Sequence, residues 1–397
     1  ALALPAIAAA LPLSAQRHPP RDAQAGTRLF PDLKTTELTE IDVTKAGARR
    51  AVTLEIRDKA WTVAERDHYP ADASRVRGLV LGIAGFTIVE EKTSDPGNYA
   101  AIGVEDIALP AAGGTQIDLK SANSTTRVIV GRSSGAKASF VRKPGGKQSL
   151  LATPQVFADP EPKNWLHRPI VDVASDRVQE ARVTTGKVSY VLTRKDRSQA
   201  NFALAAAPRG KVLASEMAGN PVGTALSGLE LDDVKKFDAA QWQSPADHAE
   251  FRTFDGWIIV ADGRVEGEQH WIRLASRYDE ALAKAFPPAP GGPKPQPDAR
   301  QDAEALATRT ASWTYEVPKY KYDAVFRPLD EIGQVEDPPQ LGIESFGSHD
   351  IDPGLVGPGR HTVISGVALA GLLIGDHGAV PHGFKFGKPV LTPELAD

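Results

Sequence analysis

Residues 33–150 share an apolar and polar pattern with residues 171–275, and this internal duplication limits the folds that the chain can adopt. In both stretches an alternating run predicts a half-buried strand, and two further strands that form a hairpin follow it. The matching positions of the opening runs are Leu38, Ile41, Val43 and Thr44 in the first copy and Val178, Ala181, Val183 and Thr184 in the second. A chain built twice from one unit is expected to form two similar modules.

Each copy continues with apolar residues at positions i, i+3, i+4 and i+7, a spacing that predicts a helix with one apolar stripe. The stripes are Val76, Leu79, Val80 and Ile83 in the first copy and Val222, Ala225, Leu226 and Leu229 in the second. A second hairpin follows, with strands around 128–130 and 140–142 in one copy and around 258–260 and 271–273 in the other. The order hairpin, helix, hairpin therefore occurs twice, although short apolar patterns can also agree by coincidence.

The composition is that of an ordinary globular protein. The chain has 397 residues, of which 41% are hydrophobic and 24% charged, with a formal net charge of -4 at pH 7. This length suits about two or three domains, and the mild acidic balance, without a stripe of Lys and Arg, argues against nucleic acid as a partner. Cysteine is absent, which excludes disulfides, thiolate nucleophiles and cysteine-ligated zinc and is compatible with an oxidising compartment.

The first 15 residues are apolar and uncharged, and a polar stretch rich in proline follows them. A signal-peptide core needs roughly 7 to 15 apolar residues and a spanning helix roughly 20, so the run fits the former or the end of the latter. A leader rich in Ala and Pro without a membrane role is the alternative. We expect residues 1–27 to be a truncated signal or membrane-anchor segment with its linker.

A stretch rich in proline at residues 287–298 predicts an exposed, extended insertion, because proline fixes φ and removes a backbone donor. Helices are expected from Tyr278 before it and from Asp298 after it, and a strand at residues 313–317 follows. The expected fold class is α+β, with two related modules of antiparallel β-hairpins and a packed helix, plus a closing helix-strand segment. The expected boundaries are 1–27 for the N-terminal segment, 28–168 and 169–277 for the modules, 278–330 for the closing segment and 331–397 for a C-terminal extension rich in Gly, Pro and His.

Residue types used in catalysis are present, but no complete catalytic signature surrounds them. Asp67 and His68 could assist Ser94 in nucleophilic chemistry, yet no Gly-x-Ser-x-Gly elbow contains Ser94. The stretch from Lys92 to Asn98 combines short polar side chains with Pro and Gly, which is typical of a structured turn. We therefore predict no catalytic residue.

Two further patterns suggest ligands but are better explained as loops. The histidines His349, His361, His377 and His382 have aspartates nearby, but no HExxH or comparable spacing organises them into a metal site. The Gly-rich stretches 131–135 and 143–147 precede no helix with Gly-Lys-Ser/Thr, so hairpin turns are a better interpretation than phosphate loops. No metal ion and no cofactor is predicted.

Aromatic residues in the later part of the chain form the candidate interaction surface. Exposed Trp and Tyr side chains can stack on sugars or dock a protein, whereas packing in the core is their commoner use. The candidates are Trp257, Trp271, Trp313, Tyr315 and Tyr320.

Several short motifs occur in an order that resembles a bacterial family of domains of unknown function. They are Leu29-Phe30-Pro31-Asp32-Leu33, Trp61 with Tyr69-Pro70-Ala71-Asp72, Lys92-Thr93-Ser94-Asp95-Pro96 with Tyr99, Gly103-Val104-Glu105-Asp106, Trp165-Leu166 and Trp313-Thr314-Tyr315-Glu316-Val317-Pro318. Members of this family are often encoded beside gliding-motility-type ABC transporter genes. The resemblance, which covers residues 28–330, implies an extracytoplasmic domain that is anchored to the inner membrane and accessory to an ABC-type export or envelope system. It implies no catalytic residues.

The function that these observations favour is a non-catalytic extracytoplasmic scaffold or binding subunit of an ABC-type transport or gliding-like envelope assembly. Its expected place is the periplasmic side of the bacterial inner membrane, with the N-terminal segment as anchor and membrane protein subunits of the transporter as partners. Two alternatives stay open: a glycan-acting or metal-dependent envelope hydrolase, and a soluble periplasmic ligand-binding protein. A deep pocket lined by converging Asp, His or Glu would favour the hydrolase.

Overall fold

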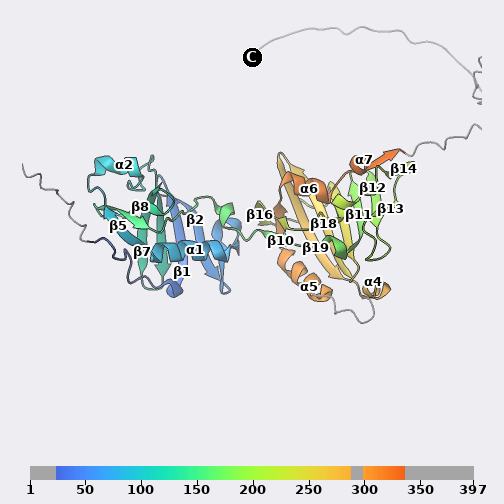
Figure 1. Ribbon diagram of the computed structural model, residues 1–397, viewed down its shortest axis with the longest axis horizontal. Coiled ribbons are helices and arrows are strands. Elements are labelled where there is room, and N and C mark those ends of the chain that lie inside the picture. The colour runs from blue at the N-terminus through green and yellow to red at the C-terminus, as the bar shows by residue number, and fades with distance from the viewer. Residues whose placement is uncertain (1–23, 288–297, 336–397) are drawn as a thin grey trace, which may run out of the picture. The chain divides into compact units, whose positions relative to one another are not determined.

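The computed structural model describes residues 24–287 and 298–335. This part of the chain contains two large antiparallel sheets, one of nine strands and one of eight, and helices pack against both (Figure 1). The expected α+β class is therefore confirmed. Most of the predicted N-terminal segment, residues 288–297 of the Pro-rich insertion, and residues 336–397 of the C-terminal extension, which hold its four histidines, lie outside the described residues.

The nine-stranded sheet has the order β4-β3-β2-β1-β6-β7-β8-β9-β5. Its strands are β1 (Leu38–Lys45), β2 (Arg49–Arg57), β3 (Ala60–Val63), β4 (Tyr69–Pro70), β5 (Thr87–Glu91), β6 (Thr115–Ser121), β7 (Thr125–Ser134), β8 (Ala138–Arg142) and β9 (Ser149–Thr153). Helix α1 (Ala73–Ala84) connects β4 to β5, and the short helix α2 (Tyr99–Ile102) precedes β6.

The eight-stranded sheet has the order β13-β12-β11-β17-β18-β19-β20-β16. Its strands are β11 (Val178–Thr185), β12 (Val188–Thr193), β13 (Ala203–Ala206), β16 (Asp233–Lys236), β17 (Asp247–Thr253), β18 (Trp257–Glu266), β19 (Gln269–Tyr278) and β20 (Trp313–Glu316). The helices of this half are α3 (Asn220–Gly223), α4 (Glu280–Ala285), α5 (Ala299–Thr310), α6 (Lys319–Val325) and α7 (Leu329–Ile332). Two small sheets pair β10 (Pro169–Val171) with β15 (Leu229–Glu230) and β14 (Lys211–Leu213) with β21 (Gly333–Val335).

The two large sheets repeat one strand order. The order β3-β2-β1-β6-β7-β8-β9-β5 in the first corresponds strand for strand to β13-β12-β11-β17-β18-β19-β20-β16 in the second, and the first sheet adds β4 at its edge. The hairpins predicted from the sequence form in both copies. The internal repeat therefore extends from the apolar pattern to the topology.

The opening strands of the two sheets also share an irregularity. The register of β1 against β6 shifts between Leu38 and Glu40, and the register of β11 against β17 shifts between Val178 and Glu180. Irregularities of this kind insert a residue at one defined position and bend the strand. Because they lie at matching positions, they support the repeat independently of the alternation of apolar residues.

Helix α1 forms as its sequence predicts. The Asp72 side chain accepts hydrogen bonds from the backbone amides of Ser74 (2.9 Å) and Arg75 (3.1 Å), which satisfies donors that the first turn leaves free. The predicted stripe is buried against the sheet, and its residues are Val76, Leu79, Val80 and Ile83. A 12-residue helix with one buried stripe covers this face of the first sheet.

The matching helix of the second copy is much shorter than predicted. Helix α3 ends at Gly223 after four residues, and Ala225 and Leu226 are buried in a turn that follows it. Pro221 and Gly223 weaken a helix interior, and a Cβ atom at Gly223 would lie 2.1 Å from the Phe202 ring. Helix α5 packs against β18 and β19 instead. Within the described residues, no helix has the length and hydrophobicity needed to cross a membrane.

Candidate functional site

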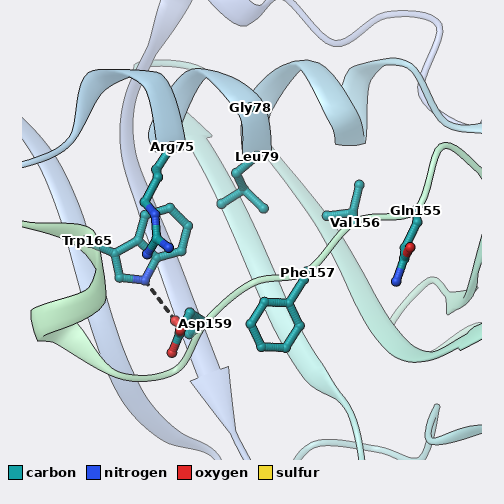
Figure 2. A pocket seen from close by; sticks show the side chains of 8 residues that line it. All are labelled: Arg75, Gly78, Leu79, Gln155, Val156, Phe157, Asp159 and Trp165. Atoms are coloured by element: carbon teal, nitrogen blue, oxygen red, sulfur yellow. Dashed lines mark hydrogen bonds between the residues drawn. The ribbon is translucent and has the colours of Figure 1, made fainter. Parts of the chain in front are cut away.

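Helix α1 lies between two grooves on the first module. One is a cavity of about 330 Å³ between α1 and the chain segment 155–165, which follows β9 and runs alongside the helix (Figure 2). We call residues 155–165 the crossing segment. Its lining consists of Arg75, Gly78, Leu79, Gln155, Val156, Phe157, Asp159 and Trp165. The second, of about 670 Å³, lies on the other flank of the helix and is lined by Thr35, Thr36, Trp61, Ala73, Ser74, Val76, Arg77, Val80 and Leu81. We call these two cavities the α1 grooves.

The crossing segment is held close to α1 by small residues and hydrogen bonds. A Cβ atom at Gly82 would lie 2.8 Å from Val156 Cγ2, so the segment can approach the helix because this position has no side chain. Trp165 Nε1 donates to the Asp159 carbonyl at 2.8 Å, as Figure 2 shows, and Arg75 donates to the Asn164 carbonyl. These contacts give the first groove a fixed wall.

Each α1 groove is lined by one large apolar side chain that is exposed to solvent. Phe157 is 75% exposed and Leu81 is 55% exposed, and Figure 2 shows the Phe157 ring on the crossing segment. Arg75 and Arg77 add two guanidinium groups to the same helix. Exposed apolar side chains that lie beside grooves are typical of sites that bind another molecule. The α1 grooves can therefore accept apolar side chains next to carboxylates.

Side chains from the end of the first sheet, Arg66 and Tyr69, contact side chains of β16 and β20 and so join the two modules. Arg66 donates to both carboxylate oxygens of Asp233, from Nε to Oδ1 at 2.5 Å and from Nη2 to Oδ2 at 2.8 Å, and this hydrogen bonding raises the pKa of Arg66. The Tyr69 ring meets the Trp313 ring edge to face, with centroids 5.0 Å apart. Burial raises the pKa of Tyr69 to about 12. The junction thus combines a paired charge with an aromatic contact.

The comparison with protein families matches residues 61–250 to a family described as "Domain of unknown function (DUF4340)". A DUF4340 domain spans residues 61–250. The match begins in β3 and ends in β17, so the DUF4340 domain includes α1, the crossing segment and both partners of the Arg66–Asp233 ion pair. No curated protein and no solved structure matches the chain.

The five aromatic residues predicted as an interaction surface lie in different surroundings. Trp257, Trp271 and Tyr315 are buried, Trp313 is half-buried at the junction, and Tyr320 is 68% exposed. Trp313 and Tyr315 are brought together around Tyr69. Trp257 donates from Nε1 to Ser276 Oγ at 2.7 Å, whereas the Trp271 ring lies under Lys235. All five residues come after residue 250 and therefore lie outside the DUF4340 match.

The residues of the first module that were considered for nucleophilic chemistry lie far from one another. Asp67 and His68 precede β4, whereas Ser94 follows β5, and β4 and β5 form opposite edges of the nine-stranded sheet. At roughly 4.8 Å per strand, tens of ångströms separate them. Asp95 Oδ1 accepts from the Gly97 amide at 3.0 Å, which confirms the structured turn. Of the two Gly-rich stretches, 143–147 lies in the turn between β8 and β9, as predicted. In the other stretch residues 131–134 are the end of β7, and only Gly135 lies in the turn to β8.

Four polar side chains form a row across the second sheet, and this row was not predicted from the sequence. Ser189, Thr184, His248 and Asp262 face one another on the neighbouring strands β12, β11, β17 and β18. His248 Nδ1 lies 2.8 Å from Asp262 Oδ1, and the hydroxyls of Thr184 and Ser189 are 2.9 Å apart. Among the contacts of the described residues, no hydrogen bond joins Thr184 to His248, and the His248 side chain is 47% exposed. The row has the geometry of cross-strand polar pairs, and only the strand register could have shown it.

Metal-ligating residues do not gather in the described part of the chain. Within residues 24–287 and 298–335, no group of three or more His, Asp or Glu side chains could hold a metal ion. The C-terminal histidines lie outside these ranges. The candidate site with the most developed geometry is therefore the pair of α1 grooves.

Proposed function

We propose that this protein is a non-catalytic, extracytoplasmic binding subunit of an ABC-type transport or gliding-like envelope assembly. In this proposal its N-terminal segment anchors it at the periplasmic side of the bacterial inner membrane. The α1 grooves dock a membrane protein subunit of the assembly. The observation that carries the proposal is the exposure of Leu81 and Phe157 beside two grooves in the DUF4340 domain.

The energetics of docking favour a partner with apolar anchors and an acidic rim. Burial of a large apolar side chain stabilises a complex by about 1.5–3 kcal/mol, so Leu81 and Phe157 together can act as the centre of an interface. Arg75 and Arg77 flank that centre, and guanidinium groups pair well with carboxylates. An amphipathic helix with acidic residues beside its apolar stripe meets both requirements.

The experiment is affinity purification of the full chain from native membranes in mild detergent, followed by identification of the proteins that co-purify. We expect membrane or ATPase subunits of the ABC type. Replacement of both anchors, by Leu81→Asp and Phe157→Asp, should reduce the recovery of these subunits by at least about tenfold, because two central contacts are lost.

The matched control is Leu109→Asp, because Leu109 is 52% exposed but lines neither α1 groove. It should leave the recovery of the subunits unchanged. Equal recovery with the double variant and with wild type would contradict docking at α1. A soluble monomeric pool without any transporter subunits would contradict the whole proposal and favour a soluble ligand-binding protein. Circular dichroism of each variant would show that it is folded.

A further inference from the structure

The repeat reveals a sheet edge that the first copy covers and the second leaves open. Strands β3 and β13 hold the same place in the strand order of their sheets. In the first copy the next strand, β4, returns to pair with β3, with Val63 opposite Tyr69 and Thr62 opposite Pro70. In the second copy the next strand, β14, pairs with β21 instead. Within the described residues β13 therefore pairs with β12 alone.

An apolar cleft lies where this missing strand would be. It has a volume of about 590 Å³, within the usual range of ligand sites. Its apolar walls come from β13, through Ala203 and Leu204, and from β14, through Val212 and Leu213. Since both strands line the cleft and are not hydrogen-bonded to each other, a strand that enters the cleft meets the edge of β13 on one side and β14 on the other.

The backbone of β13 is free to accept such a strand. In the part of the chain that the structure describes, residues 203–206 form no backbone hydrogen bond outside their pairing with β12. Three of these four residues are exposed. The sequence Ala-Leu-Ala-Ala has no charged residue and no proline, the residues that natural proteins use to protect an edge from pairing. The edge is therefore suited to strand addition.

We infer that the cleft between β13 and β14 binds an extended peptide segment of a partner protein, which adds a strand to β13. The segment carries small apolar side chains that face Leu204 and Leu213. It also carries a carboxylate, because Arg209 lies in the turn between the two strands and has no ion pair among the described residues. In strand addition the main-chain hydrogen bonds give affinity and the side-chain pockets give specificity. This inference does not depend on the function proposed for the α1 grooves.

The test is hydrogen–deuterium exchange of the full chain with a synthetic peptide of alternating valine and threonine that has an aspartate at each end. At saturating peptide, exchange at the amides of β13 and β14 should slow by about tenfold or more, because added strands protect edge amides. Exchange in β3, whose edge β4 already covers, should not change. A second peptide with proline at every other position lacks the donors and should protect neither strand.

Two variants on one strand separate the cleft from the surface around it. Ala203 lines the cleft, whereas Ala206 is equally exposed and does not line it. Ala203→Lys should abolish the protection by the peptide and Ala206→Lys should keep it.

Four results would overturn the inference. They are an absence of protection at millimolar peptide, equal protection of β3, equal loss of protection with both variants, and slow exchange of β13 without the peptide. In the last case, slowing that grows with protein concentration would assign the edge to a second copy of the chain. Slowing that is independent of concentration would assign it to the chain itself.

Discussion

The two modules use the same strand order but cover their sheets differently. In the first, α1 and the crossing segment lie over the sheet and leave the α1 grooves on either flank. In the second, α3 is a single short turn, and α5 and α6, which come later in the chain, pack against β19. The two copies therefore share the order of their strands and differ in the helices and loops that cover them. Grooves and open edges arise where the coverings diverge.

One internal device recurs in both modules at different positions. Arg142 in β8 and Arg194 after β12 are both buried, and each guanidinium stacks on an aromatic ring. Arg142 donates to the carbonyls of Val104 and Gly146 and to Asp106. Arg194 donates to backbone carbonyls alone, and burial lowers its pKa. Each module thus uses a buried cation that donates to the backbone carbonyls around it.

The largest effect is expected when these arginines are replaced by an apolar side chain of similar length. Arg142→Met removes the guanidinium that donates to two carbonyls and to the Asp106 carboxylate. Arg194→Met removes the guanidinium that donates to the carbonyls of Val178 and Ser175, of which Ser175 keeps a hydrogen bond from the Val178 amide. Since an unsatisfied buried group costs about 1–3 kcal/mol, each variant should lower the free energy of unfolding by about 3–5 kcal/mol. Urea unfolding followed by circular dichroism measures the change.

Lysine variants at the same two positions provide the control. A lysine keeps the charge but has one ammonium group in place of a planar fork, so it cannot reach all of the carbonyls. Arg142→Lys and Arg194→Lys should recover less than half of the lost stability. Full recovery by lysine would show that charge alone matters. A large loss in one module only would show that the two arginines are not equivalent devices.

Local features of the two modules could be predicted from the sequence, and long-range ones could not. Asp58 and Lys59 form a tight turn with positive φ values, and Asp72 begins α1, because both features depend on a few neighbouring residues. The approach of Val156 to Gly82 and the pairing of His248 with Asp262 depend on segments that are distant in sequence. In a sequence, Arg142 and Arg194 resemble surface residues. The α1 grooves were therefore not predictable, whereas α1 itself was.

An intermediate effect is expected at the junction, where it tests whether the modules unfold together. Asp233→Asn removes the carboxylate that Arg66 binds through two hydrogen bonds, and loss of such bonds costs about 1–3 kcal/mol. If the modules form one cooperative unit, urea should then unfold both sheets at a lower concentration. Destabilisation of the second sheet alone, measured by hydrogen exchange, would mean that the modules unfold independently.

Asp233→Asn should also change the pKa of Glu316, which lies near Asp233 at the junction. Burial, and after it the charge of Asp233, raises the pKa of Glu316 above its ordinary 4.5. The folded state therefore holds this proton more tightly than the unfolded state, so the stabilisation is complete below pH 4.5 and is lost as pH rises through the raised pKa. Asp233→Asn should lower the pKa of Glu316, as measured by carbon NMR of its carboxyl group. An unchanged pKa would show that burial alone raises it.

The smallest effect is expected at an ion pair that both sheets have at the same register position. Glu40 lies opposite Lys120 in the first sheet and Glu180 lies opposite Arg252 in the second, with N···O distances of 2.6 Å and 3.4 Å. Double-mutant cycles with alanine should give a coupling of about 0.3–1 kcal/mol for the first pair, as is usual for partly exposed cross-strand charges.

The coupling in the second sheet should be weaker than in the first, although the positions match. Glu180 lies 2.5 Å from Arg182, and Arg252 lies 2.6 Å from Glu250, so both members of the second pair have a partner nearer than each other. In the first pair only Lys120 has one, because it lies 2.5 Å from Asp42. Loss of either residue of the second pair is then offset by the contact that the remaining one keeps. A coupling for Glu180 with Arg252 as strong as that for Glu40 with Lys120 would contradict this expectation. It would show that the two copies share the coupling free energy of the pair as well as its position in the sheet. High salt should reduce both couplings, because the four side chains are partly accessible to solvent.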